Sequence, residues 1–367
     1  MLRSVPKFLG WGAIVVIAVA SLVSASVYVV TYHPDAIENE AIVSTEPAPQ
    51  AKPGQQLKVL SWNVQFFAGR PNNKFFFDGG TDPWPSQRMV NSTAIAVANI
   101  IKQEDPDIIF LQELDDGAER TRYHDQLQQL LDLLPAKYAM HTSSFYWLAD
   151  YVPHGELLGG VGMKMSIISR YRIEHATRYA LPNITTDDII TEQFKPKRAV
   201  HGVYLPIEGG GRVNILNTHL SAYAQGTNTM ALQVASVGEV LRDIEANGES
   251  AILAGDFNLV PTESAYQELG ADSRRYYNPA GTEIAPLLDN YKSVPSLSEM
   301  LGDDHQDWFT HIANDNQSEM PDKTIDYIFY TDELILGEHY VRSSDTLKIS
   351  DHLPIVATFT LPAPQSR

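Results

Sequence analysis

The sequence predicts an α/β body, built on a mixed sheet or a pair of packed sheets with helices outside, behind an apolar N-terminal segment. From Leu57 onward, short apolar runs typical of buried strands alternate with longer segments of helical period. The strand-like runs outnumber the helical ones, and several follow one another directly, which disfavours a strict βαβ succession. With 44% apolar and 20% charged residues, the chain has the composition of a globular protein with a sizeable core.

The N-terminal segment is predicted to be a transmembrane helix. Arg3 and Lys7 precede an uncharged, mostly apolar run from Phe8 to Tyr32, and about 20 apolar residues suffice to cross a bilayer as a helix. A cleaved signal peptide is the alternative, with Ser24-Ala25-Ser26 as its small-residue site, but the apolar run continues past that site. The flanking charges favour a cytoplasmic N-terminus and a periplasmic body, which would be secreted if the segment were cleaved.

Composition divides the chain into four parts. Residues 1–33 form the predicted anchor or signal peptide, and residues 34–56, rich in proline and polar residues, are predicted to be a flexible linker. Residues 57–362 form a folded domain, and residues 363–367 a short tail.

Within this domain the order of elements follows from hydrophobic periodicity. Strands are predicted at 57–64, 107–112, 163–169, 213–218, 250–254, 325–330 and 355–361. Helices are predicted at 86–103, 125–134 and 230–244, the first with Ser86 as its N-cap.

Charge and cysteine content exclude several classes of function. The net charge of −18 disfavours a broad basic surface that grips long nucleic acid. Nuclease chemistry stays open, because a local metal site can reverse the field where a phosphate binds. The absence of cysteine excludes disulfides, thiolate metal ligands, a cysteine nucleophile and a lipidated cysteine.

Three apolar strands end in a polar side chain. Asn63 closes the first strand, Glu113 follows the run Ile108–Gln112, and His219 follows the run Asn214–Thr218. Taken singly, these residues are more often a turn residue, a solvated strand end and a structural histidine. A hard cation such as Mg²⁺ takes oxygen ligands and keeps several waters, however, so one or two carboxylates at such strand ends suffice to hold it.

The segment Gly255-Asp256-Phe257-Asn258 is the most informative one. Asp256 and Asn258 are two residues apart, so in an extended chain they project to the same side. An acceptor and a donor side by side can orient a water and hold a phosphoryl oxygen.

An acid and a histidine in the last part of the chain form a predicted pair. Asp326 lies in an otherwise apolar strand, where a buried carboxylate needs a partner. His352 offers that partner, since an Asp–His pair is the usual way to orient a general base. Asp351 lies beside it as a candidate metal ligand.

Together, six segments resemble the endonuclease/exonuclease/phosphatase family and indicate a membrane-anchored member of bacterial type. They are S-W-N at 61–63, Q-E at 112–113, N-T-H-L at 217–220, G-D-F-N at 255–258, I-D-Y-I at 325–328 and S-D-H-L-P at 350–354. The resemblance covers roughly Leu57 to Leu361. It implies a four-layered α/β sandwich, two packed mixed sheets flanked by helices, with the site at one end.

The resemblance also implies a metal site. Glu113 would be the principal ligand, supported by Asn63 and Asp351, and the cofactor would be Mg²⁺, with Mn²⁺ or Ca²⁺ as alternatives. The chain would thus be a divalent-metal-dependent hydrolase of phosphodiester or phosphomonoester bonds.

The resemblance assigns the remaining residues to the reaction. His352, oriented by Asp326, would activate the attacking water, and Asp256 would position that water or share its proton. Asn258 would hold the transition-state oxygens, and His219 would donate to the scissile phosphate from the other side.

The motifs leave the substrate open among a phospholipid headgroup, a small phosphodiester and nucleic acid. Two features resemble the deoxyribonuclease-I, sphingomyelinase and phosphoinositide-phosphatase branches more than the abasic-site endonucleases. They are Gln65 leading into Phe66-Phe67, and His219. The loop Phe75-Phe76-Phe77 could enter a bilayer, stack nucleobases or pack under its own loop. The rival hypothesis is a catalytically inactive, membrane-tethered scaffold protein of the same fold. No obligate protein partner is predicted.

Overall fold

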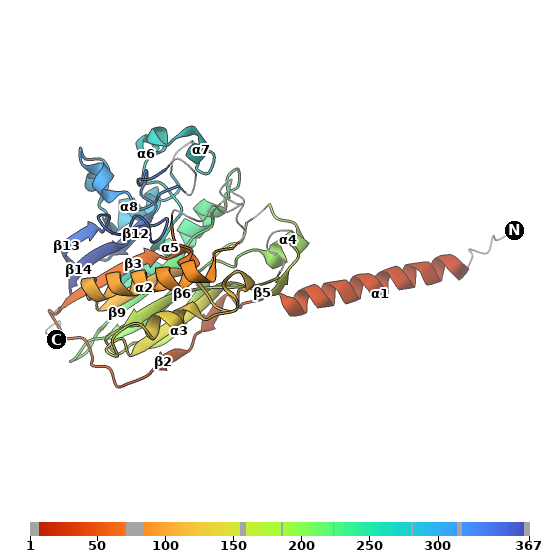
Figure 1. The fold of residues 1–367 in the computed structure, drawn as a ribbon, viewed down its shortest axis with the longest axis horizontal. Coiled ribbons are helices and arrows are strands. Elements are labelled where there is room, and N and C mark those ends of the chain that lie inside the picture. The colour runs from red at the N-terminus through yellow and green to blue at the C-terminus, as the bar shows by residue number, and fades with distance from the viewer. Residues whose placement is uncertain are drawn as a thin grey trace.

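The computed structural model describes residues 7–70, 84–154, 159–184, 186–222, 224–279, 282–313 and 318–362, with side chains from residue 11 onward. The loop Phe75–Phe77 and the tail 363–367 lie outside the described residues. Two seven-stranded mixed sheets pack against each other with helices on the outside, which confirms the predicted four-layered α/β sandwich (Figure 1).

The first sheet has the strand order β13-β14-β3-β4-β6-β5-β2. Its strands are β13 (Ile335–Val341), β14 (Ile355–Thr360), β3 (Gln56–Asn63), β4 (Ile108–Asp115), β6 (Gly159–Ser169), β5 (Met140–Val152) and β2 (Ile42–Ser44). The second sheet has the order β1-β7-β8-β9-β10-β12-β11. Its strands are β1 (Ile37–Asn39), β7 (Glu174–Ala180), β8 (Ala199–Pro206), β9 (Arg212–His219), β10 (Ser250–Asp256), β12 (Asp326–Tyr330) and β11 (Lys292–Val294). Among these strands only β3 with β4 and β9 with β10 pair in parallel.

Two long helices, α2 (Gln87–Glu104) and α5 (Thr229–Ala246), cover the outer faces of the sheets. The other helices of the body are α3 (Gln126–Leu131), α4 (Ile189–Phe194), α6 (Glu263–Glu268), α7 (Ala271–Arg274), α8 (Ala285–Asn290) and α9 (Leu297–Met300), with the 3-10 turns η1 (Gln65–Phe67), η3 (Glu119–Thr121) and η4 (His305–Trp308). Ser86 caps α2, because its side chain accepts a hydrogen bond from the backbone N–H of Met89. This confirms the predicted helix start.

Both faces of the central strands are buried. In β4, Ile108 and Phe110 belong to the core between the two sheets, whereas Ile109 and Leu111 pack in the cluster under α2 and α3. This explains why the central strands appear in the sequence as unbroken apolar runs rather than as an alternation. A third cluster fills the space beneath α5.

The segment 34–56 differs from the expected flexible linker. Its strand β1 extends the second sheet by pairing with β7, and β2 extends the first sheet by pairing with β5. Ala51 is fully buried in the core between the sheets. Edge strands are held by backbone hydrogen bonds and need no apolar side-chain pattern, so a polar, proline-rich composition conceals them.

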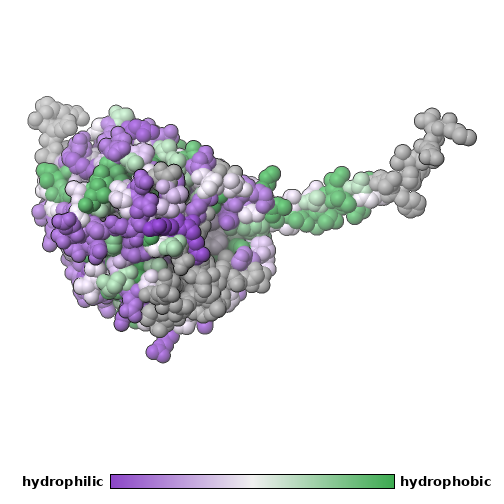
Figure 2. Space-filling view, turned by 90° about the horizontal axis from the view of Figure 1, so that it is seen from above, coloured by the Kyte–Doolittle hydropathy of each residue, from purple (hydrophilic) through white to green (hydrophobic). Residues whose placement is uncertain are grey.

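Ahead of this segment lies α1 (Lys7–Val30). Among the described residues, α1 is the only helix long and apolar enough to cross a membrane, with a span from Trp11 to Val30. A signal sequence has the same properties. The helix projects from the body (Figure 1), and in a space-filling view its hydrophobic surface stands out from a largely hydrophilic body (Figure 2).

The contribution of the segment 34–56 can be measured by truncation. We expect deletion of residues 1–30 to leave a soluble body that unfolds cooperatively. Deletion of residues 1–55 removes β1, β2 and Ala51, and should lower the melting temperature by on the order of 5 °C relative to the shorter deletion. Thermal unfolding followed by circular dichroism measures both. Equal melting temperatures would show that the segment does not stabilise the body.

Candidate active site at one end of the sandwich

The eight residues predicted from the sequence meet at one end of the two sheets. They are Asn63, Glu113, His219, Asp256, Asn258, Asp326, Asp351 and His352. Register explains the convergence, because Asn63 pairs with Gln112 across the parallel strands β3 and β4. In the second sheet, Asp256 pairs with both His219 and Asp326. Asn63, His219, Asp256 and Asp326 are thus held at the ends of buried strands, whereas Glu113 lies near the end of β4, and Asn258, Asp351 and His352 lie in adjoining loops.

Two site residues have left-handed backbone conformations. Glu113 has φ +59° and lies where the pairing of β4 with β6 shifts register, and Asn258 has φ +52°. A glutamate in this region costs roughly 1–2 kcal/mol, whereas asparagine tolerates it better. The irregularity in β4 directs the Glu113 carboxylate toward Asn63.

Asn63 connects the two carboxylates at the centre of the site. Its Nδ2 donates to Glu113 Oε1 at 3.1 Å and to Asp256 Oδ2 at 3.0 Å. Its Oδ1 accepts from the backbone N–H of Gln65 at 3.0 Å. The amide nitrogen thus faces both carboxylates, and ligation of a cation by Asn63 would use the second lone pair of Oδ1.

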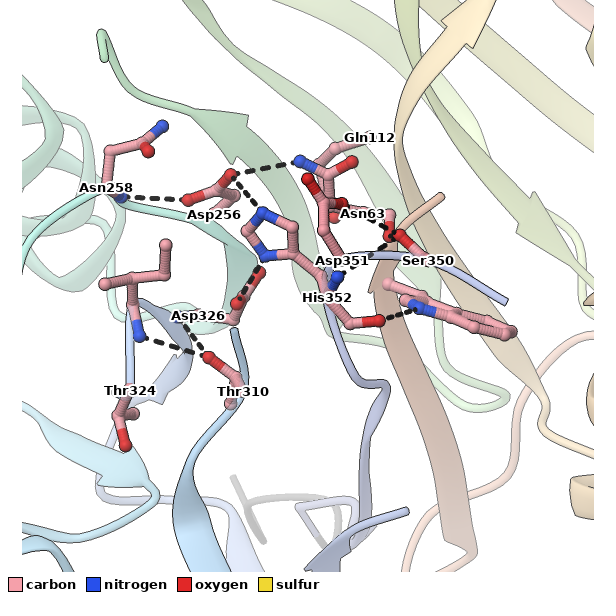
Figure 3. Close-up of polar contacts among 12 residues, drawn as sticks. Asn63, Gln112, Asp256, Asn258, Thr310, Thr324, Asp326, Ser350, Asp351 and His352 are labelled. Atoms are coloured by element: carbon pink, nitrogen blue, oxygen red, sulfur yellow. Dashed lines mark hydrogen bonds and ion pairs between the residues drawn. The ribbon is translucent and has the colours of Figure 1, made fainter. Parts of the chain in front are cut away.

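Asp326, His352 and Asp256 form a chain of buried contacts (Figure 3). His352 Nδ1 lies 2.8 Å from Asp326 Oδ2, and His352 Nε2 lies 3.5 Å from Asp256 Oδ2. The Asp256 carboxylate also accepts from the backbone N–H of Asn258 at 2.9 Å. The predicted Asp–His pair is therefore present, and a second carboxylate faces the other nitrogen of the ring.

The backbone around His352 is also held in place. Trp62 Nε1 donates to the His352 carbonyl at 2.8 Å, and Ser350 Oγ accepts from the His352 N–H at 3.2 Å. Ser350 Oγ in turn lies 2.8 Å from the Asn63 carbonyl, to which it donates. These bonds tie the loop before β14 to the end of β3.

The site perturbs the titration of its own groups. Burial, reinforced by Asp326, raises the pKa of Asp256 to about 7, against the opposing effect of His352. Burial alone would lower the pKa of His352, but Asp326 and Asp256 raise it to about 10. At neutral pH His352 is therefore a cation, and Asp256 can exchange a proton.

His219 has the opposite character. Burial, with the positive charges of Arg198 and His352, holds its pKa well below the ordinary value, so the ring is neutral. Its Nε2 lies 3.3 Å from Asp256 Oδ2 and 3.9 Å from Glu113 Oε1. A neutral ring beside two carboxylates carries its proton on Nε2.

The donor set fits a divalent cation. Burial, and after it the nearby charge of Asp351, raises the pKa of Glu113, so the charged carboxylate is unfavourable here without a further partner. Glu113 and Asp256 each offer a carboxylate oxygen, and these oxygens lie within 4.8 Å of one another and of the ring of His219, whose protonated Nε2 serves as a donor. Carboxylate and amide oxygens are the ligands that hard cations prefer, and a cation would offset this charge.

Sequence reasoning missed several supporting residues. Gln65 Nε2 donates to Asp351 Oδ2 at 2.7 Å and so orients this carboxylate. Gln112 Nε2 donates to Asn217 Oδ1 at 2.7 Å, and this buried contact links β4 of one sheet to β9 of the other. Gln112 and Asn217 lie within the Q-E and N-T-H-L motifs, but their contact depends on the distance between the two sheets, which the sequence does not contain. Gln65 lies outside the six motifs, and its contact with Asp351 joins residues 286 positions apart in the chain.

A cleft of about 360 Å³ lies beside the site. Asn258 and His311 line it on the catalytic side, with Lys323 beside them, and Tyr276 and Tyr277 line it farther out. The cleft gives a substrate room next to the Asn258 amide.

Comparison with known proteins supports this picture. Residues 60–352 match the family described as the Endonuclease/Exonuclease/phosphatase family. No curated protein matched. The structure of an endonuclease/exonuclease/phosphatase from Beutenbergia cavernae DSM 12333 is 23% identical, with a TM-score of 0.56 over 85% of this chain and 73% of that one. The human Nocturnin catalytic domain with bound sulfate is 19% identical, with a TM-score of 0.51 over 88% and 96% of the two chains. At these identities the structural likeness confirms the fold.

The close contact of β9 and β10 predicts a strict requirement for glycine at position 255. A Cβ there would lie 2.0 Å from the Thr218 carbonyl oxygen. We expect Gly255→Ala to destabilise the protein by about 3 kcal/mol or more, measured by denaturant unfolding. Gly270→Ala is the matched control, because a Cβ at that position meets no atom within 4 Å. Equal stability of the two variants would contradict this account of the strand contact.

Proposed function

The chain belongs to the endonuclease/exonuclease/phosphatase family, and from this premise we propose how its residues hydrolyse a phosphate ester with water. The observation that carries the proposal is the contact chain Asp326–His352–Asp256 beside Asn63 and Glu113. It brings together a carboxylate that would accept a proton, an imidazolium and a carboxylate that would bind a metal. In-line displacement at phosphorus requires these three functions together.

Glu113 would be the main ligand of the divalent metal, with Asn63 and Asp351 in support. When bound, Mg²⁺, or Mn²⁺ or Ca²⁺ in its place, would polarise a phosphoryl oxygen and offset its negative charge. Gln65 positions Asp351 for this task through its hydrogen bond. An amide that donates to a ligating carboxylate in this way keeps the carboxylate from rotating.

Asp256 is our candidate for the group that takes the proton of the attacking water. A pKa of about 7 matches a general base that works near neutral pH. The sequence alone favoured His352 for this step, with Asp256 positioning the water. The raised pKa of His352 supports the reverse assignment, in which its imidazolium holds the phosphoryl oxygens and Asp326 keeps it charged.

Asn258 and His219 would bind the phosphate from two further sides. One N–H of the Asn258 amide donates to the Leu220 carbonyl at 3.2 Å, which leaves the second for a phosphoryl oxygen. His219, neutral and protonated on Nε2, would donate to the phosphate without adding charge. These donors are in position before the reaction, so they need little reorganisation.

The substrate classes that we retain are a phospholipid headgroup, a small phosphodiester and nucleic acid. The net charge of −18 disfavours long nucleic acid. We also propose that α1 remains as an anchor and holds the body outside the cytoplasm. Hydrolysis of bis(p-nitrophenyl) phosphate by the purified protein, restored by Mg²⁺ after EDTA, tests the enzyme against the inactive scaffold. Absence of hydrolysis with every divalent metal would favour the scaffold.

The metal assignment predicts the behaviour of Glu113→Gln. The substitution keeps the side-chain volume and removes the charge that holds the cation, so kcat/KM should fall by on the order of 100-fold or more. Excess Mg²⁺ should restore only part of the activity. Glu239→Gln, at an exposed position of α5, is the control and should behave like the wild type. Near-normal activity of Glu113→Gln at low Mg²⁺ would disprove the ligand assignment.

The two perturbed groups predict a bell-shaped dependence of activity on pH. Activity should rise as the pH passes about 7, where Asp256 loses its proton, and fall as it passes about 10, where His352 loses its charge. Asp256→Asn should lower kcat by on the order of 100-fold and abolish the acidic limb. An acidic limb that persists in Asp256→Asn would move the base to another residue, His352 first.

A further inference from the structure

The helix α1 joins the body at the same end of the sandwich as the catalytic residues. Thr31, directly after α1, forms an antiparallel bridge with Ala149 of β5. Ala149 pairs with Val161 of β6, and Met163 of β6 pairs with Asp115, two residues beyond Glu113. The strand β5 lies two strand spacings, roughly 10 Å, from β4, and Ala149 lies about four residues, roughly 13 Å, farther along the strands than Glu113. The base of α1 is therefore on the order of 16 Å from the site. Figure 1 shows α1 leaving from this end of the body.

No flexible linker separates α1 from the body. The helix ends at Val30, and the next residue, Thr31, is already buried against β5. Thr31 Oγ1 donates to the Val27 carbonyl at 2.7 Å and lies 2.9 Å from His33 Nε2. The body is therefore held at a fixed distance from the end of the helix.

Aromatic residues mark where a bilayer would meet α1. Trp11 and Tyr28 are exposed near the two ends of the helix, at 69% and 64%. Their separation along a helix is roughly 25 Å, close to the thickness of a hydrocarbon core. Tryptophan and tyrosine favour the two membrane interfaces. The outer interface then lies at Tyr28, within one helical turn of the bridge to the body.

Two isoleucines on α4 are exposed at this same end. Ile189 and Ile190 are 81% and 67% exposed. The helix is fixed to the base of α1, because its last residue, Phe194, accepts a hydrogen bond from Trp147 of β5 at 2.8 Å and packs against the cluster that contains Ala149. Figure 2 shows hydrophobic surface where α1 meets the body.

We propose that this end of the body rests on the lipid bilayer, with Ile189 and Ile190 inserted into it. The catalytic centre then opens onto the membrane surface, and the substrate is the phosphodiester headgroup of a membrane lipid. The docking rests on α1 being retained as an anchor, and the substrate class rests on the proposed phosphoesterase function.

Burial of apolar surface, rather than charge, would drive this docking. Around α4 the acids Asp187, Asp188 and Glu192 outnumber Lys195 and Lys197, so the surface has no excess of positive charge that would attract anionic lipid. Moving two isoleucines out of water is favourable without any charged partner. We therefore expect insertion into zwitterionic phosphatidylcholine, with little dependence on salt.

The absence of cysteine allows a direct measurement of depth on the full chain. Ile190→Cys carries an environment-sensitive fluorophore, in protein reconstituted into phosphatidylcholine vesicles. The control is Ile335→Cys, which is 66% exposed but lies at the opposite end, where Ile335 pairs with Thr360 and Thr360 with Gln56. We expect a blue-shifted emission, and at least threefold stronger quenching by spin-labelled lipid, at position 190 only.

Two depth results would overturn the docking. One is a fluorophore at position 190 that is as exposed to water as the one at position 335. The other is a fluorophore shielded from water but not quenched by lipid, because contact with another protein copy would produce it.

Hydrolysis rates on a membrane substrate and on a soluble substrate distinguish membrane docking from catalysis. The double variant Ile189→Ser/Ile190→Ser should hydrolyse vesicle phospholipid at least tenfold more slowly, and bis(p-nitrophenyl) phosphate at the wild-type rate. Ile335→Ser should change neither rate. Equal effects on both substrates, or none on the lipid, would overturn the lipid assignment. A wild type that hydrolyses neither substrate would contradict the phosphoesterase function, whereas the depth measurement decides the docking independently.

Discussion

Burial of several carboxylates in one small volume is the constraint around which this end of the molecule is organised. Asp256 and Asp326 are almost fully buried, and Glu113 lies beside them. Charges of one sign in such a place are costly unless donors or cations surround them. The amide of Asn63 and the ring of His352 supply these partners, which is why each has both of its polar ends engaged.

Such compensation requires accurate placement, and the two sheets provide it. The partners come from β3, β4, β10, β12 and the loop before β14, which are far apart in the chain. Gly255 lets β10 approach the Thr218 carbonyl, and the buried pair Gln112–Asn217 sets the spacing between the sheets. The rigid sheets thus keep the site residues at distances that a flexible loop could not maintain.

The sequence predicted the central strands and the site residues because both leave a local mark. Strands such as β4 are apolar on both faces, and the motif residues stand at strand ends. The strand β5 was not predicted, since its inward side includes Thr142 and Ser144 in place of apolar residues. The edge strands β1 and β2 were concealed by their polar composition. The direction of each pKa shift was also inaccessible, because it depends on which charges meet in space.

The rigid junction at Thr31 has a kinetic consequence in the proposed arrangement. A protein without a flexible tether cannot sweep through a volume, so its encounters with substrate are confined to a plane. Turnover would then follow the mole fraction of substrate within the leaflet and its lateral diffusion, and inert lipid would slow the enzyme by surface dilution. The relevant concentration for such a catalyst is counted per area of membrane.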